Sequence, residues 1–242
     1  MLLSTDALVI VAKYPEPGRV KTRLGATLGY ERSAALYRAF LLDLAERFTA
    51  AEHAGRFDLY WACPPGARPL GEVVGRSARI FAQRGDDFAE RLRNISCDMH
   101  AAGYRRLVIL GSDSPHVSAE TVADAFAALD QSDISIGPAF DGGYYLIGLP
   151  LTPEPPDLFS GIVMSTATVY AETATRAAAL GLTLTTLAPT SDVDEISDLS
   201  RLRALLAASN DGASPLCPRT FAALEALDIE QPILQSINGS SL

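Results

Sequence analysis

The fold is decided by Arg105-Arg-Leu-Val-Ile-Leu110-Gly-Ser-Asp113-Ser-Pro115-His-Val-Ser118-Ala-Glu-Thr121. Its first six residues are two arginines followed by the apolar run Leu107–Leu110. Such a run, rich in branched side chains, is typical of a buried parallel strand. The segment from Gly111 to Pro115 ends that strand, and Ser118 is placed to cap a helix that continues to about residue 129. A strand that passes through a polar turn into a helix is the repeating unit of a parallel α/β sheet.

The same alternation extends along the 242-residue chain. Apolar runs predict further strands at 6–12, 57–62, 78–82, 133–137, 144–149 and 182–187. Helical spacing and capping residues predict helices at 31–51, 86–102, 165–181 and 195–208, with a short helical stretch at 220–227. We therefore expect one α/β domain at 1–208, with a mostly parallel sheet and helices on both faces. Residues 209–242 are expected to form a C-terminal extension packed on that domain or trailing from it.

Composition limits the classes of partner. The net charge of −9 argues against broad nucleic-acid binding, which needs a dense positive surface. No apolar run approaches the roughly 20 residues of a membrane span. Three widely spaced cysteines fit neither a disulfide framework nor a zinc site, and the N-terminal residues do not resemble a secretory signal. We expect a cytoplasmic protein with no nucleic-acid partner and no membrane span.

Both lysines of the chain, Lys13 and Lys21, lie in one loop after the first predicted strand, although the chain has 18 arginines. Arg19, Lys21 and Arg23 alternate along this loop, so an extended backbone would place them on one side. Three like charges repel unless an anion lies between them, and phosphate suits arginine and lysine. Gly18 would let the backbone approach such a ligand closely. The alternative is a solvated basic turn, and the loop lacks the Walker spacing.

Two acidic positions also follow predicted strands. Asp113 comes directly after the central strand, where a carboxylate could bridge a divalent cation to a diphosphate. An Asx-type turn leading into the following helix explains Asp113 equally well. Asp192-Val-Asp194 follows the last strand, so Asp194 is a candidate second metal ligand and also an obvious helix cap.

Asp141-Gly142-Gly143 begins the strand at 144–149. The two glycines would let a bulky ligand lie against the backbone, and Asp141 could bond sugar hydroxyls. A tight hairpin turn is slightly favoured over that interpretation. His116 has no visible catalytic partner and is not included among the candidates. Because the loops at 13–23, 111–116, 141–143 and 192–194 all follow strands, we expect them to meet at the carboxyl edge of the sheet.

Four motifs, in chain order, resemble one bacterial family. They are Ala12-Lys13-Tyr-Pro-Glu-Pro-Gly18-Arg19-Val-Lys21-Thr-Arg23-Leu24, Leu110-Gly-Ser-Asp113-Ser-Pro115, Gly137-Pro-Ala-Phe-Asp141-Gly-Gly-Tyr-Tyr-Leu-Ile-Gly148-Leu149 and Asp192-Val-Asp194-Glu-Ile-Ser-Asp198-Leu199. The family is that of the radical-SAM- and selenodomain-associated transferases, some of which are described as arsenosugar-biosynthesis glycosyltransferases. The resemblance spans about residues 7–205 and implies the nucleotide-diphospho-sugar transferase superfamily with its GT-A fold.

The resemblance also implies roles for matching residues. Lys13, Gly18, Arg19, Lys21 and Arg23 fall where the family binds nucleotide phosphates. Asp113 and Asp194 match its metal-binding aspartates, and Asp141, Gly142 and Gly143 match the substrate pocket. Of these, Arg23, Lys21 and Asp113 are the candidates for catalysis.

The chain departs from the family pattern at four places. Ser114, Ala89 and Met164 replace cysteine, glycine and tryptophan, and the proline-lysine pair of the nucleotidyltransferase signature is missing after Leu24. The last difference weakens an assignment as a pyrophosphorylase.

The function expected from sequence is a transferase that depends on Mg²⁺ or Mn²⁺ and uses a nucleotide-activated donor, such as a nucleotide sugar, with a small-molecule acceptor. One rival is nucleotidyl transfer from a nucleoside triphosphate to a phosphorylated acceptor, with release of pyrophosphate. A second rival is a nucleotide-binding module without catalysis.

Overall fold

Seven strands form one mixed sheet in the computed structural model, which describes residues 4–209 and 216–227. Their order across the sheet is β3-β2-β1-β4-β6-β5-β7. Only β6 runs antiparallel to its neighbours, β4 and β5. The strands are β1 (Asp6–Val11), β2 (Asp58–Cys63), β3 (Arg79–Ala82), β4 (Arg106–Gly111), β5 (Ile134–Pro138), β6 (Tyr144–Pro150) and β7 (Leu184–Thr186). The predicted fold class and all seven predicted strands are confirmed.

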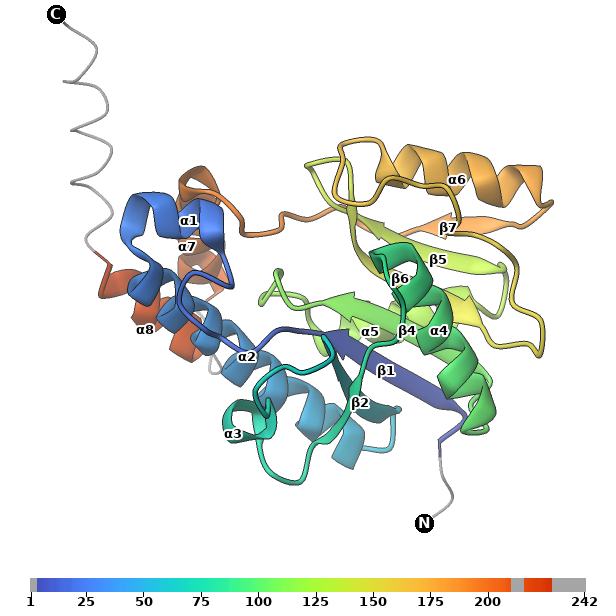
Figure 1. The fold of residues 1–242 in the computed structure, drawn as a ribbon, viewed down its shortest axis with the longest axis horizontal. Helices are drawn as coiled ribbons and strands as arrows, with labels where there is room; N and C mark the ends of the chain where they lie inside the picture. Colours follow the sequence, from blue (N-terminus) through green and yellow to red (C-terminus); the bar gives the residue numbers. More distant parts are fainter. Residues whose placement is uncertain (1–3, 210–215, 228–242) are drawn as a thin grey trace, which may run out of the picture.

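Helices cover both faces of this sheet (Figure 1). They are α1 (Thr22–Leu28), α2 (Tyr30–His53), α3 (Gly71–Val74), α4 (Phe88–Ala101), α5 (Ala119–Ala128), α6 (Val169–Ala179), α7 (Ile196–Ser209) and α8 (Pro218–Glu225). Helices α4 and α6 pack on one face, and the other six share a second hydrophobic core. The central strands are buried on both faces, which explains why they are continuous apolar runs rather than alternating ones.

The central strand pair shows how the two cores divide. On β1, Leu8 and Ile10 pack with α2, whereas Ala7 and Val9 belong to the core beneath α4. Strand β4 divides in the same way, because successive side chains of a strand point to opposite faces. Both strands end at the same edge of the sheet, and their loops therefore begin side by side.

Helix α1 was not predicted, because its first residues were expected to belong to the loop at 13–23. The helix has seven residues, and it buries only Leu24, Gly25 and Leu28. Gly25 is required where α1 meets α2, since a Cβ there would lie 2.4 Å from the ring of Tyr30. An amphipathic stretch this short gives little periodic signal, so packing on α2 rather than intrinsic preference explains it.

The last described helix, α8, packs on α2 and α7. The backbone N–H groups of Arg219 and Thr220, in the first turn of α8, donate hydrogen bonds to the buried carboxylate of Asp43 on α2. Residues 210–215 and 228–242 of the predicted extension lie outside the described residues, and the boundary at 208 stays a prediction. None of the described helices is long and apolar enough to cross a bilayer.

Candidate functional site

A cleft of about 650 Å³ opens at the carboxyl edge of the sheet. The four loops predicted to meet there all contribute to its walls. Eight of the ten predicted site residues line it, namely Lys13, Arg19, Lys21, Arg23, Asp113, Asp141, Gly143 and Asp194. Gly18 and Gly142 lie in the same loops but outside the lining. The predicted convergence is therefore seen in the geometry, while the role of each residue stays a prediction.

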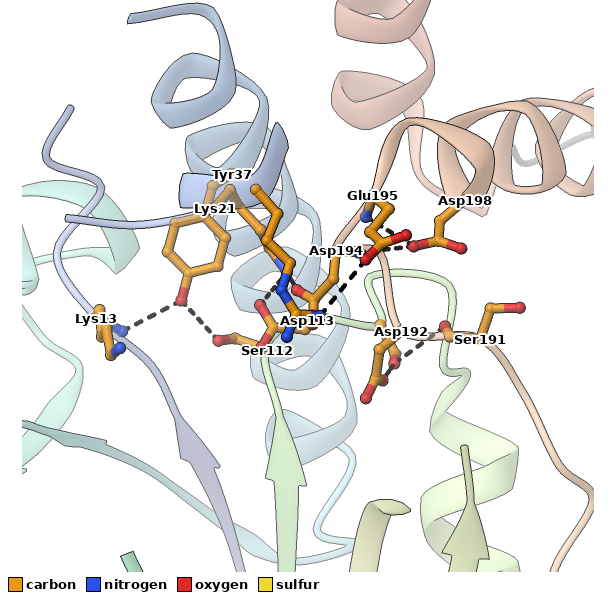
Figure 2. Close-up of polar contacts among 12 residues, drawn as sticks. Lys13, Lys21, Tyr37, Ser112, Asp113, Ser191, Asp192, Asp194, Glu195 and Asp198 are labelled. Carbon is orange, nitrogen blue, oxygen red and sulfur yellow. Dashed lines mark hydrogen bonds and ion pairs between the residues drawn. The ribbon is translucent and has the colours of Figure 1, made fainter. Parts of the chain in front are cut away.

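Lys21 lies at the centre of the site (Figure 2). Its ammonium forms ion pairs with Asp113 and with Asp194, the latter at 3.0 Å between Nζ and Oδ1. The side chain is only 3% exposed, and its Nζ lies 5.8 Å from the ring centre of Tyr37 and 5.9 Å from that of Phe40. One ammonium therefore joins the two carboxylates that the sequence assigned to a metal.

The expected arrangement of the basic loop is wrong in one respect. Lys21 has a left-handed backbone (φ 45°) directly before α1, so the segment from Arg19 to Arg23 is not extended. Its side chain is buried, whereas those of Arg19 and Arg23 remain exposed. The loop thus supplies one buried cation that faces carboxylates and two exposed guanidinium groups at the cleft.

Burial would lower the pKa of Lys21, because it disfavours the charged form. The neighbouring carboxylates of Asp113 and Asp194 outweigh that effect, and the pKa of Lys21 lies above its ordinary value. The side chains of Asp113 and Asp194 are 47% and 44% exposed, so both remain accessible from the cleft. Lys21 is therefore charged at neutral pH and shared by two accessible acids.

Backbone contacts bring Asp113 and Asp194 together across 81 positions of sequence. The N–H of Val193 donates to the carbonyl of Asp113 at 3.0 Å, and the side chain of Val193 is fully buried. This contact fixes the 192–194 segment beside the end of β4.

Asp194 does not cap a helix, contrary to the sequence analysis. Helix α7 begins at Ile196, and it is the carboxylate of Asp198 that accepts hydrogen bonds from the N–H groups of Asp194 and Glu195, at 3.0 and 2.8 Å. The side chain of Asp194 is instead turned towards Lys21 (Figure 2). Because Asp198 performs the capping, the Asp194 carboxylate is left for the cleft.

Asp192 is a third acid, beside Asp113 and Asp194, and it is more deeply buried than either of them. Its carboxylate accepts a hydrogen bond from the hydroxyl of Ser114, which itself lies fully buried. Burial raises the pKa of Asp192 to about 6, and the nearby charges of Asp113 and Asp141 act in the same direction. Asp192 would therefore take up a proton on mild acidification.

The Asp141-Gly142-Gly143 segment is the tip of the β5–β6 hairpin, as the sequence favoured. The N–H of Gly143 donates to the Asp141 carboxylate at 2.9 Å, which closes an Asx turn. Gly142 has φ +91°, and a Cβ there would lie 2.0 Å from the carbonyl oxygen of Ala167. The N–H of Tyr170 donates to the carbonyl of Gly142 at 3.0 Å. The glycine thus serves the packing of the hairpin on the start of α6, and Asp141 stays exposed at the cleft.

His116 is largely buried beside Thr190. Its Nε2 lies 2.5 Å from the hydroxyl of Thr190, and its Nδ1 has no partner within the described part of the chain. Burial, together with the positive charge of Arg47, lowers the pKa of His116 to about 4.

The His116 environment predicts a loss of stability on acidification. The unfolded chain binds this proton at about pH 6.5, whereas the folded protein binds it only near pH 4, so acidification through that window favours unfolding. We expect His116→Gln to flatten the fall in melting temperature between pH 6.5 and pH 4, measured against wild type from a common reference at pH 7.5. Parallel profiles for the two proteins would contradict this assignment.

Several residues of the cleft were not found by sequence reasoning. The hydroxyl of Tyr37 on α2 is 2.7 Å from that of Ser112 and accepts the N–H of Lys13 at 3.2 Å, and burial raises its pKa to about 12. Arg91 on α4 lines the cleft with its Nε bonded to the carbonyl of Gly85 at 3.0 Å. Others are Pro64, Gln83, Phe88, Tyr144, Ser165 and Thr166. Pro64 and Gln83 directly follow β2 and β3, so the strand-end rule could have found them.

The site is suited to an anion with an associated cation. Exposed arginines lie beside accessible carboxylates, which matches a diphosphate bridged by a hard divalent ion. No group of three or more histidine, cysteine or acidic side chains that could hold a metal occurs within 4–209 and 216–227. A divalent ion would thus depend on Asp113, Asp194, water and oxygen atoms of the substrate, which is a common arrangement for Mg²⁺.

Comparison with known proteins identifies the family. The model of the family described as "Uncharacterized protein conserved in bacteria (DUF2064)" matches residues 43–166. A crystal structure from Desulfovibrio desulfuricans G20, provisionally described as a nucleotide-diphospho-sugar transferase, is 34% identical with a TM-score of 0.84. The alignment covers 95% of this chain and 99% of that one. No curated protein matches the chain.

More distant solved structures share the fold. A cytidylyltransferase from Leptospira borgpetersenii serovar Hardjo-bovis has a TM-score of 0.56 at 11% identity, with 99% of each chain covered. The 4-diphosphocytidyl-2C-methyl-D-erythritol synthase of Anaerococcus prevotii has a TM-score of 0.54 at 8% identity, with 84% of this chain and 99% of that one covered. At these identities the likeness concerns architecture alone. The matched model and the relative of full length together show that this chain belongs to the DUF2064 family of bacterial proteins.

Proposed function

We propose that this protein is a transferase that uses a nucleotide-activated donor, most simply a nucleotide sugar. The observation that carries the proposal is the single cleft in which the basic loop faces Asp113 and Asp194. The relative at 34% identity, with its provisional description as a nucleotide-diphospho-sugar transferase, supports the same class. The motifs that resemble those of the radical-SAM- and selenodomain-associated transferases support it further, and that resemblance favours glycosyl transfer.

The diphosphate would bind between the loop and the carboxylate pair. Arg19 and Arg23 are exposed at the cleft and can each form a forked contact with phosphate oxygens. Among the described residues, Arg23 forms an ion pair only with Glu195, at 3.6 Å between exposed groups, and such a pair is easily exchanged for a ligand. Lys13 lies exposed on the same wall.

Asp113 and Asp194 would hold Mg²⁺ or Mn²⁺ together with oxygen atoms of the donor. The two carboxylates fit such an ion, because both reach the same ammonium and both are half exposed. When bound, the ion would neutralise negative charge that develops on the leaving diphosphate. Arg19 and Arg23 would act on the same charge, and Asp141 could orient an acceptor hydroxyl.

The phosphate assignment predicts a loss of affinity in arginine variants. Arg19→Ala and Arg23→Ala should each weaken binding of UDP or GDP by roughly 1.5–3 kcal/mol, the scale of one hydrogen bond to a charged group. Calorimetry in the presence of Mn²⁺ measures this. Arg56→Ala is the matched control, because Arg56 is an exposed arginine that pairs with Glu120 and does not line the cleft. Equal affinity in all four proteins would remove the loop from the phosphate site.

Product analysis tests the proposed reaction. Release of a nucleoside diphosphate from one member of a nucleotide-sugar panel, in the presence of Mn²⁺ and candidate acceptors, is the expected result. Release of pyrophosphate from a nucleoside triphosphate and a phosphorylated acceptor would instead establish nucleotidyl transfer. Nucleotide binding with neither product, and with no effect of Mn²⁺, would establish a module without catalysis.

A further inference from the structure

Lys21 and a divalent ion would compete for the same two carboxylates. The ammonium of Lys21 pairs with Oδ1 of Asp113 and with Oδ1 of Asp194, and these are the carboxylates assigned to the metal. A divalent ion that binds these two oxygen atoms takes the place of the ammonium. Charge repulsion would also keep a divalent ion from settling beside a lysine that stayed in position.

The surroundings of Lys21 hold it in this position. Its Nζ lies near the rings of Tyr37 and Phe40 on α2, and only 3% of the side chain is exposed. No other cation pairs with Asp113 within the described part of the chain. The ligand-free protein therefore carries its own counterion at the acidic pair.

We propose that Lys21 closes the metal site of the free protein, and that a nucleotide diphosphate opens it by offering the ammonium a new partner. This rests on the proposed function, since it assumes that the cleft binds a diphosphate and a metal. Lysine suits the exchange because its charge lies at the end of a flexible four-carbon stem. Arg19 and Arg23 line the same cleft and belong to the same loop as Lys21. A phosphate bound to the two arginines would therefore lie beside that loop, where the ammonium could pair with it.

Binding of metal and nucleotide should then be coupled. A metal that enters alone must displace Lys21 without giving it another partner, and this lowers the affinity for the metal. With the diphosphate present, Lys21 leaves the carboxylate oxygens and pairs with phosphate oxygens instead. The two carboxylates then become free to bind the metal. Such coupling is reciprocal, so the metal must also raise the affinity for the nucleotide by the same factor.

The experiment measures Mn²⁺ binding without nucleotide, from the electron paramagnetic resonance signal of the free ion. Lys21→Met keeps the apolar stem and removes the charge, and we expect it to bind Mn²⁺ at least about tenfold more tightly than wild type, the factor equivalent to one charged hydrogen bond. Arg56→Met is the matched control, because it removes an exposed positive charge that pairs with Glu120 and does not line the cleft. We expect the control to bind Mn²⁺ as wild type does in the absence of nucleotide.

A second measurement uses the wild-type protein and needs no variant to fold. The chain has only two lysines, so labelling lysine with ¹³C at Cε gives two signals. We expect UDP or GDP with Mg²⁺ to shift the Lys21 signal, and Mg²⁺ alone at the same concentration to leave it in place.

The outcomes separate this inference from the proposed function. Equal Mn²⁺ affinity in wild type and Lys21→Met, with nucleotide binding intact, would overturn the closing role and leave the transferase site standing. A Lys21 signal that moves with Mg²⁺ alone would do the same. Absence of nucleotide binding in wild type would overturn the proposed function, and the coupling with it.

Discussion

Replacing Asp113 with asparagine should lower turnover by about 10²–10³-fold, the usual effect of removing one preorganised group that stabilises a developing charge. The amide keeps the size of the carboxylate but loses its charge, so Lys21 keeps only Asp194 as an ion-pair partner and the site can no longer hold a divalent ion with two acids. Turnover is measured as release of nucleoside diphosphate from the nucleotide sugar that wild type accepts. The melting temperature should stay close to that of wild type, because Asp113 is half exposed.

A matched control separates catalysis from general charge effects. Asp130→Asn removes an exposed carboxylate that pairs with Arg106, outside the cleft. It should retain the turnover of wild type. Asp113→Asn with turnover within about threefold of the control would show that the carboxylate pair does not serve the reaction, because that factor corresponds to less than 1 kcal/mol of barrier.

The sequence predicted the sheet and the meeting of its loops because those features depend on local signals. Apolar runs located every strand, and the rule that ligands bind beyond the carboxyl ends of strands placed Lys21, Asp113 and Asp194 at one edge. What it could not predict is which atoms pair. Lys21 was grouped with Arg19 and Arg23 on the assumption of an extended backbone, and the left-handed turn before α1 separates them.

Helix ends show the same limit. Asp194 and Asp198 are both acidic residues near the start of α7, and the sequence, which favoured Asp194 as the capping residue, does not show which of the two takes that role. The contact between Val193 and Asp113 decides it, because that contact turns Asp194 towards Lys21 and leaves Asp198 to bond the free N–H groups. Tyr37 was missed for a related reason, since a tyrosine in the middle of a long helix is indistinguishable from a core residue until its neighbours are known.

The backbone at Gly142 should tolerate no side chain. Gly142→Ala is expected to destabilise the protein by about 3–5 kcal/mol, from strain at a positive φ together with a steric conflict. Its Cβ would lie 2.0 Å from the carbonyl oxygen of Ala167, and it would also meet the neighbouring backbone carbons at 2.6 and 2.8 Å. The free energy of unfolding in urea measures the effect. Ala167, which the added methyl group would meet, directly follows Ser165 and Thr166 in the cleft wall. Weaker nucleotide binding should therefore accompany the loss of stability.

Gly103 provides the control that isolates the contact from the backbone strain. Its φ of +94° is close to the +91° of Gly142, but nothing lies within 4 Å of the position that its Cβ would occupy. Gly103→Ala should therefore cost only the strain of the left-handed backbone, about 1–2 kcal/mol. The difference between the two variants measures how firmly the hairpin is held against the start of α6. If both variants lose the same stability, the segment at 165–168 yields to the added methyl group, and that wall of the cleft is adaptable rather than fixed.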